Sequence, residues 1–366
     1  MSKLISQLSQ TGRYGYTLPQ TAIDEYSTDS IFDNLKRSKP YHACGLNEYD
    51  VYEYFNSLDL KGENSITNGA DYTLSILDDI SKLDGFTGIH PYQLADAGQG
   101  AFELLFTLRH MLCDMLGVDM ISLGQVTPKQ SLMSIMLMIK SYFASKKEPR
   151  NKVIAVDGVC PFAVKTLESM GFETVSSTCS LDEIKHLLSS DVAALFIRTP
   201  DDTGVFASDI LKITQAVHDA GALCVLDGKN QKSLSGISRP GEMGFDCIMM
   251  ALCDLFDIAD KFAGDASYLV GVKADLVDFV PVPMVEIDDL EQHYFDYDRE
   301  LSVGKPNEFY GNFTSWIKAL GFILSQGYEG FVNNAKACKL NSEYAKLKNG
   351  TTSTVNACVD KRRIDE

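Results

Sequence analysis

One acidic residue lies in the position of this chain that is best suited to chemistry. Asp227 directly follows residues 223–226, a short apolar run rich in β-forming side chains, and two more apolar runs follow at 247–252 and 267–272. Continuous apolar runs of this length are typical of strands that a parallel sheet buries on both faces. An acid at the carboxyl end of such a strand lies where open α/β sheets bind ligands, so Asp227 is the first candidate functional residue.

The elements that must position Asp227 form a regular alternation between residues 95 and 275. Strands are predicted at 153–156, 192–197 and 223–226, and helices at 98–116, 181–189 and 210–220. Gly117 predicts the end of the first helix, and Ser180 is a candidate N-cap for the second. This alternation is typical of βαβ units and predicts a doubly wound α/β domain.

Composition and charge narrow the classes of partner. The chain has 366 residues, 45% of them hydrophobic, which allows one large domain with extensions or two domains. It carries 33 basic and 50 acidic residues, for a net charge of −17. Nucleic acid and anionic membranes require basic patches, so we expect neither as a partner. We also expect no membrane span and no signal peptide, because the apolar runs are short and residues 1–10 lack a cationic start.

Cysteine and histidine spacing offers no second kind of site. The nine cysteines form no CxxC pair, and the six histidines show no spacing that suggests a metal site or catalysis. We therefore predict no metal, and a reduced chain with buried thiols in the cytoplasm.

The segment around Asp227 resembles a known family. It reads DGKN at 227–230, SRPGEMGFD at 238–246 and LCDLF at 252–256. Subunit 2 of the glycine-cleavage P-protein, the pyridoxal-phosphate (PLP) glycine decarboxylase, is similar and reads roughly DGAN, ARPGDMGFD and LHKTF there. The resemblance implies a fold-type I PLP-dependent transferase-like large domain, with three α/β/α layers and a mostly parallel sheet.

The resemblance extends over about residues 6–344. The family's GFxGxHPYQ segment matches 85–93, its FLPVPVV-like segment matches FVPVPMV at 279–285, and a helix is predicted at 315–326. Residues 6–19 match the family's opening segment, either as an arm around a neighbouring subunit or as a coil on their own domain. We expect an N-terminal arm and extension at 1–90, the large domain at 91–275, a return segment and helix at 276–345, and a tail at 346–366. The family's small C-terminal domain is expected to be largely missing.

The resemblance also implies that the cofactor site is altered. Asp254 replaces the family's Schiff-base lysine, and Cys253 replaces the histidine before it. Cys160 replaces the ring-stacking histidine, and Phe162 replaces a nearby threonine. Pro128-Lys129-Gln130-Ser131 replaces the phosphate-binding segment, and the substrate loop becomes an acidic stretch at 63–74, where only Tyr72 is retained. Pro128 has no N–H to offer a phosphate. Asp227 is the one vestigial cofactor-binding residue, as a partner for the ring nitrogen.

Three hypotheses about function follow. The leading one is a non-catalytic homologue of subunit 2 with no cofactor, which acts by binding a P-protein-like subunit, another copy of itself, or a lipoyl carrier protein. The alternative is an active PLP-dependent glycine dehydrogenase (decarboxylating), or a related lyase, whose Schiff base has moved to Lys229 or Lys261. The third is a protein that binds another small ligand in the vacated pocket.

Overall fold

A computed structural model describes most of the chain. The described residues are 47–59, 75–83, 85–86, 95–202, 205–256, 267–307 and 310–349. The chain divides into two compact units, Met1–Thr67 and Asn68–Glu366. Helix α2 (Glu48–Asp59) belongs to the first unit, and every element below belongs to the second. Within the described ranges, no helix combines the length and apolar character needed to cross a bilayer.

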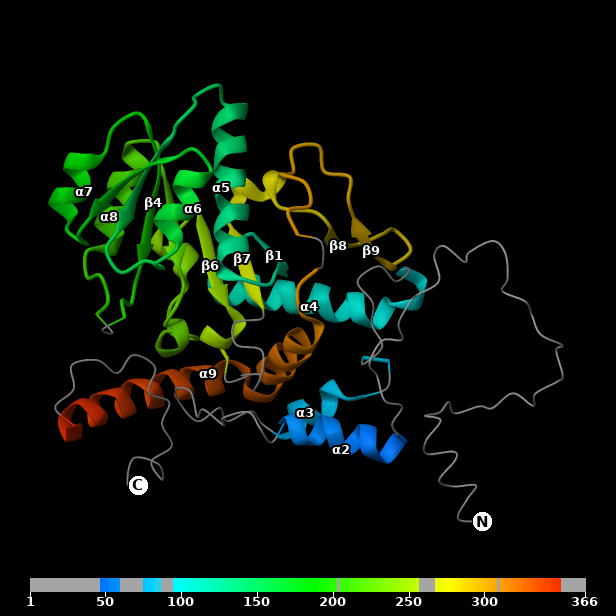
Figure 1. Cartoon of the computed structure of the whole chain (residues 1–366). Coiled ribbons are helices and arrows are strands. Elements are labelled where there is room, and N and C mark those ends of the chain that lie inside the picture. The colour runs from blue at the N-terminus through cyan, green and yellow to red at the C-terminus, as the bar shows by residue number, and fades with distance from the viewer. Residues whose placement is uncertain are drawn as a thin grey trace, which may run out of the picture. The chain divides into compact units, whose positions relative to one another are not determined.

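A seven-stranded sheet forms the centre of the second unit (Figure 1). Its strands are β1 (Met120–Gln125), β2 (Lys152–Val156), β3 (Glu173–Ser177), β4 (Val192–Arg198), β5 (Leu223–Asp227), β6 (Cys247–Ala251) and β7 (Tyr268–Val272). Their spatial order is β1-β7-β6-β5-β4-β2-β3. Strands β2 to β6 pair in parallel, whereas β7 runs antiparallel to both β6 and β1. The predicted, mostly parallel sheet is confirmed, and the last of the three apolar runs is its antiparallel member.

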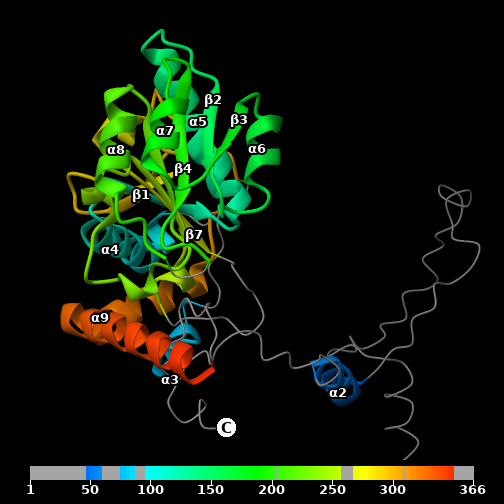
Figure 2. The same ribbon diagram turned by 90° about the vertical axis from the view of Figure 1, so that its left-hand side faces the viewer.

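Helices cover both faces of the sheet (Figure 2). Helices α4 (Gln99–Leu116), α7 (Leu181–Leu187), α8 (Ile210–Asp219) and α9 (Phe313–Asn349) contribute to one core, and α5 (Pro128–Ser145) and α6 (Ala163–Ser169) to the other. Strand side chains alternate between the cores, since Ile248 and Met250 pack in the first and Cys247 and Met249 in the second. This alternation explains why each strand is apolar throughout.

The remaining elements are short. They are α3 (Ser75–Ser81), the hairpin strands β8 (Met284–Ile287) and β9 (His293–Asp296), and the 3-10 helices η2 (Ala95–Ala97), η3 (Gln231–Ser233), η4 (Pro240–Met243), η5 (Leu252–Asp254) and η6 (Ala274–Phe279). The hairpin is tied to α4 because Arg109 donates from Nη1 and Nη2 to both carboxylate oxygens of Glu286, at 3.1 and 3.2 Å. Arg299 donates to the same carboxylate at 2.7 Å.

Helix ends test three of the sequence predictions. Gly117 ends α4 in the left-handed conformation, with φ of 69°, as predicted. Ser180 lies at the N-cap position of α7, as predicted, although its side chain makes no capping hydrogen bond. The predicted end of the helix at residue 326 is confirmed: Gly327, with φ of 57° and ψ of 180°, is not helical and separates two helical segments of α9, the second of which continues to Asn349.

The thiols need one correction. Cys113, Cys160, Cys179, Cys224, Cys247 and Cys253 are free, as predicted for a reduced chain. Cys338 on α9, however, is disulfide-bonded. Four subjects of the sequence analysis lie outside the described residues, namely the arm at 6–19, the loop at 63–74 with Tyr72, Lys261, and residues 350–366.

Candidate functional site

A cavity of about 250 Å³ lies at the carboxyl ends of β4 and β5. Its lining includes six of the positions singled out in the sequence: Pro128, Cys160, Phe162, Asp227, Lys229 and Asp254. Cys253, Lys129, Gln130 and Ser131 are not among the lining residues. The place is the one expected for an open α/β sheet, and the chain's own topology brings these distant residues together.

The strands and the turns after them determine where the polar groups of the cavity lie. Asp227 is the last residue of β5, and its register partner on β4 is Arg198, the last residue there. Gly228 continues the chain beside β6, where an added Cβ atom would lie 2.9 Å from the Cβ of Met250 and 3.0 Å from the backbone oxygen of Met249. Only glycine fits this close approach, which accounts for the Asp-Gly pair seen in the sequence. Asp254 ends η5, the short helix that follows β6.

A buried ion pair occupies the floor of the cavity. Arg198 donates from Nε and Nη2 to Oδ2 of Asp227, at 3.0 and 2.6 Å, and the Cys160 backbone N–H donates to the same oxygen at 3.2 Å. The side chains of Arg198 and Asp227 are only 4% and 6% exposed. The sequence analysis missed this partner of Asp227. The sequence does show that Arg198 and Asp227 each directly follow a predicted strand, at 192–197 and 223–226, but only the strand order makes these two strands neighbours.

A second carboxylate extends the pair towards solvent. Arg198 Nη1 donates to Oδ2 of Asp202 at 2.9 Å, and Lys229 Nζ lies 3.3 Å from the other oxygen of Asp202. Both Asp202 and Lys229 are about half exposed, with side-chain exposures of 56% and 52%. The amine of Lys229 is therefore at the cavity, as the alternative hypothesis requires, but it is engaged by a carboxylate.

Cys160 lacks the properties of a nucleophile. Burial, reinforced by the nearby Asp227 carboxylate, raises the pKa of the Cys160 thiol well above its ordinary value of 9.0. The protonated thiol is neither a metal ligand nor an attacking group at neutral pH. It also presents no ring face on which a heterocycle could stack.

The start of α5 satisfies its own backbone donors. Thr127 is the N-cap: its Oγ1 accepts from the Gln130 N–H at 3.2 Å, while Oε1 of Gln130 accepts from the N–H groups of Val126 and Thr127 at 2.9 and 3.2 Å. The Ser131 N–H donates to the Thr127 carbonyl at 3.1 Å. This is a capping box, and its T-x-x-Q pattern was readable in the sequence. A helix start closed in this way has few N–H groups left for an anion.

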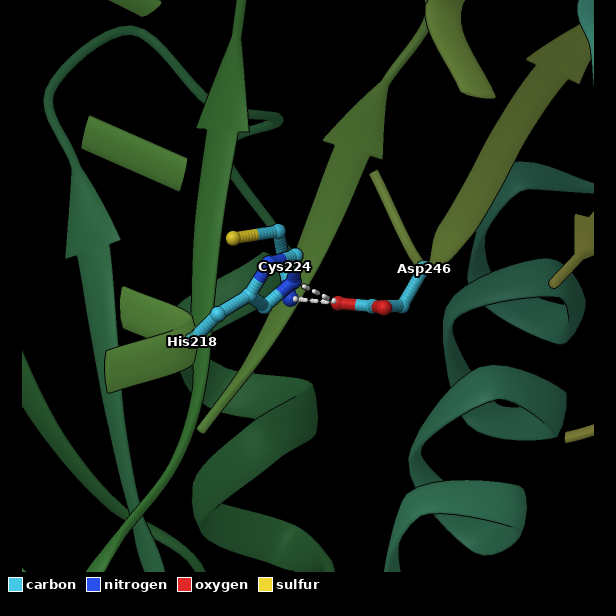
Figure 3. A group of neighbouring side chains, drawn as sticks. All are labelled: His218, Cys224 and Asp246. Atoms are coloured by element: carbon cyan, nitrogen blue, oxygen red, sulfur yellow. Dashed lines mark hydrogen bonds and ion pairs between the residues drawn. The ribbon is translucent and has the colours of Figure 1, made fainter. Parts of the chain in front are cut away.

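A second polar cluster lies at the opposite ends of the strands (Figure 3). His218 on α8, Cys224 on β5 and Asp246 before β6 have potential metal-ligand atoms within 4.8 Å of one another, although their spacing in the sequence predicts no metal. Asp246 Oδ2 already accepts from the backbone N–H of Cys224 at 2.7 Å and bonds His218 Nε2 at 2.8 Å. Burial raises the pKa of the Cys224 thiol, which disfavours the thiolate that a metal needs. The cluster is best explained as a structural set of hydrogen bonds that links α8 to the sheet.

Comparison with solved structures addresses the fold. The chain resembles a glycine decarboxylase (P-protein) of the glycine cleavage system, solved in inhibitor-bound form, with a TM-score of 0.64 and 16% identity over 95% of this chain and 80% of that one. It also resembles the sphingosine-1-phosphate lyase of Burkholderia pseudomallei, with a TM-score of 0.59 and 14% identity over 86% of this chain and 77% of that one. The fold is that of the fold-type I PLP-dependent enzymes, as predicted.

Comparison with sequences addresses the family. Residues 21–292 match the family model described as "Glycine cleavage system P-protein". A relative from Caldanaerobacter subterraneus subsp. tengcongensis, "Probable glycine dehydrogenase (decarboxylating) subunit 2", is 33% identical over 95% of this chain and 74% of its own length. The relative of the same name from Thermotoga petrophila is 32% identical over 94% and 74%. The chain therefore belongs to the glycine cleavage system P-protein family.

Proposed function

We propose that this chain is a non-catalytic member of the P-protein family, related to subunit 2, that acts by association with a partner chain. The observation that carries the proposal is the set of side chains that line the cavity. Asp254 lies in its lining where the resemblance places the Schiff-base lysine, and the strand-end acid Asp227 is already paired with Arg198.

The residues present do not fit PLP, the cofactor that the family implies. A ring nitrogen needs an acid at the strand end, but Oδ2 of Asp227 already accepts three N–H groups from within the chain, which leaves only Oδ1 for such a partner. A phosphate group needs free backbone N–H donors at a helix start, but the capping box at Thr127 engages the Gln130 N–H and Pro128 has no N–H. An aldehyde needs an amine, and Asp254 supplies a carboxylate instead.

Surface chemistry supports a role in association. Helix α9 buries Trp316, Phe322 and Phe331 against the sheet domain. Apolar side chains also reach its exposed side, namely Leu324, Tyr328, Leu340 and Tyr344, with exposures between 46% and 76%. Large exposed apolar side chains along one element are typical of a surface that contacts another protein. The names of the relatives in Caldanaerobacter and Thermotoga, "subunit 2", favour a complementary P-protein-like subunit as that partner. A lipoyl carrier partner and a cytoplasmic location stay predictions.

One observation favours the alternative function, that of an active PLP-dependent enzyme. Lys229 lies in the cavity lining, so a relocated Schiff base would have an amine there. Its Nζ already contacts Asp202 at 3.3 Å, and attack on an aldehyde would require that contact to be broken. We therefore expect Lys229 to remain unmodified when PLP is added.

Absorbance and reduction test the proposal directly. Purified protein is expected to be colourless. Addition of PLP followed by borohydride is expected to leave no lysine-linked pyridoxyl group in the cavity, as measured by peptide mass mapping. An aldehyde-modified Lys229 together with a visible absorbance band would overturn the non-catalytic assignment. A Lys229→Gln variant shows whether any label belongs to the cavity rather than to a surface lysine.

A further inference from the structure

A small cavity lies against residues 231–240, in the connection between β5 and β6. Its volume is about 10 Å³, and its walls include Met115 and Leu116 at the end of α4 and Leu255 at the end of η5. The residues that line it differ from those that line the larger cavity at Asp227. A cavity of this size holds about one water molecule.

Two serine hydroxyls at this cavity form no hydrogen bond with the described part of the chain. They are Oγ of Ser235 and Oγ of Ser238, and both atoms are buried. The backbone N–H groups are satisfied, because Ser235 donates to the Gln231 carbonyl and Ser238 to the Leu234 carbonyl, each at 3.0 Å. A buried hydroxyl left unpaired is destabilising, so native proteins pair such groups with protein atoms or with ordered water. Two such hydroxyls at one water-sized cavity therefore indicate a bound water rather than a dry void.

The two hydroxyls lie on a turn that connects two parts of the fold. Before the turn, Gln231 Nε2 donates to the carbonyl of Thr199, directly after β4, at 2.7 Å. Within the turn, Gly236 has φ of 76° and lies so close to α9 that an added Cβ atom would be 2.8 Å from the Cβ of Phe331. The conformation of this turn therefore determines how the segment after β5 packs against α9.

We propose that this cavity binds one ordered water molecule that bridges Oγ of Ser235 and Oγ of Ser238. The two serines flank Gly236 in the sequence, so the water holds in place the turn that packs against α9. The bridge depends on a side chain that the family segment ARPGDMGFD does not have, because alanine stands there at the position of Ser238. The same comparison indicates that the fold accommodates Ser238→Ala.

Urea unfolding of two single variants and their double variant tests the shared water. Ser235→Ala and Ser238→Ala each remove one hydrogen bond to the water, and each is expected to raise the unfolding equilibrium constant about fivefold. The double variant is expected to raise it about fivefold as well, rather than about 25-fold, because both changes remove the same water. The proposal is overturned if either single change lowers the constant, since that is the effect of removing a hydroxyl that is unpaired in the parent. It is also overturned if the two effects multiply, since each hydroxyl would then have a separate partner.

Magnetic relaxation dispersion of oxygen-17 water measures the bound water directly, because it counts the water molecules that stay bound for long times. Ser238→Ala is expected to hold about one such water fewer than the parent. Ser208→Ala changes an exposed serine and is expected to match the parent in both measurements. An unchanged number of long-lived waters in Ser238→Ala would overturn the proposal. Neither measurement depends on the PLP and borohydride result.

Discussion

The buried pair at the floor of the cavity offers a measurable test of the structure. In an Arg198→Met variant, the Asp227 side chain, at 6% exposure, would lose the guanidinium that donates to it at 3.0 and 2.6 Å. Removing one partner of a buried ion pair costs about 3–5 kcal/mol, because the remaining charge is held out of water. We expect the free energy of unfolding to fall by about that amount.

The other contributions to this change are smaller. The Cys160 N–H would still donate to Asp227 at 3.2 Å, but one hydrogen bond contributes only about 0.5–1.5 kcal/mol. Loss of the bond from Arg198 to the exposed Asp202 adds at most about 1 kcal/mol. The uncompensated charge of Asp227 therefore accounts for most of the expected loss of stability.

Urea unfolding can follow this loss through Trp316, the single tryptophan of the chain, which is 2% exposed. A second change, Asp227→Asn, removes the charge and keeps an oxygen for the Cys160 N–H. The double variant Arg198→Met/Asp227→Asn is expected to be more stable than Arg198→Met alone. This ordering distinguishes a stranded charge from a simple packing defect.

A matched control uses an exposed pair. Lys212 contacts Asp209 at 2.7 Å and its side chain is 71% exposed, so Lys212→Met is expected to change stability far less than Arg198→Met does. The reasoning is refuted if Arg198→Met loses no more than this control. It is equally refuted if the effects of Arg198→Met and Asp227→Asn simply add.

Two further predictions concern Asp254, at the position of the family's Schiff-base lysine, and the hydrogen bond between His218 and Asp246. Asp254→Lys is expected not to restore glycine-dependent exchange of labelled bicarbonate in the presence of a lipoyl carrier, because Asp227 stays paired with Arg198; exchange well above the parent would contradict this. The hydrogen bond to Asp246 raises the pKa of His218 above 6.5, so its stabilisation is complete below that pH and is lost as pH rises through the folded-state pKa. His218→Gln is therefore expected to reduce the unfolding free energy more in acid than in alkali, and an equal loss at both would refute the charge effect.

Much of the scaffold could be predicted from the sequence. Apolar runs at 223–226 and 192–197 became β5 and β4, and the amphipathic spacing before Gly117 became α4. Such elements follow from local composition. A strand that is buried on both faces must be apolar throughout, and a helix whose last turn ends in the left-handed backbone conformation favours glycine there. The position of Asp227 at a strand end follows from the same pattern.

The pairing of the polar groups depended on tertiary structure. Strand order decides that β4 lies beside β5, and register then places Arg198 against Asp227, although 29 positions separate them. The direction of β7 likewise depends on which segments become neighbours, and so does the clustering of His218, Cys224 and Asp246. Ion pairs and hydrogen bonds act over a few ångströms, so residue types and spacing alone could place an acid at the site but could not determine that the fold would supply its counter-ion.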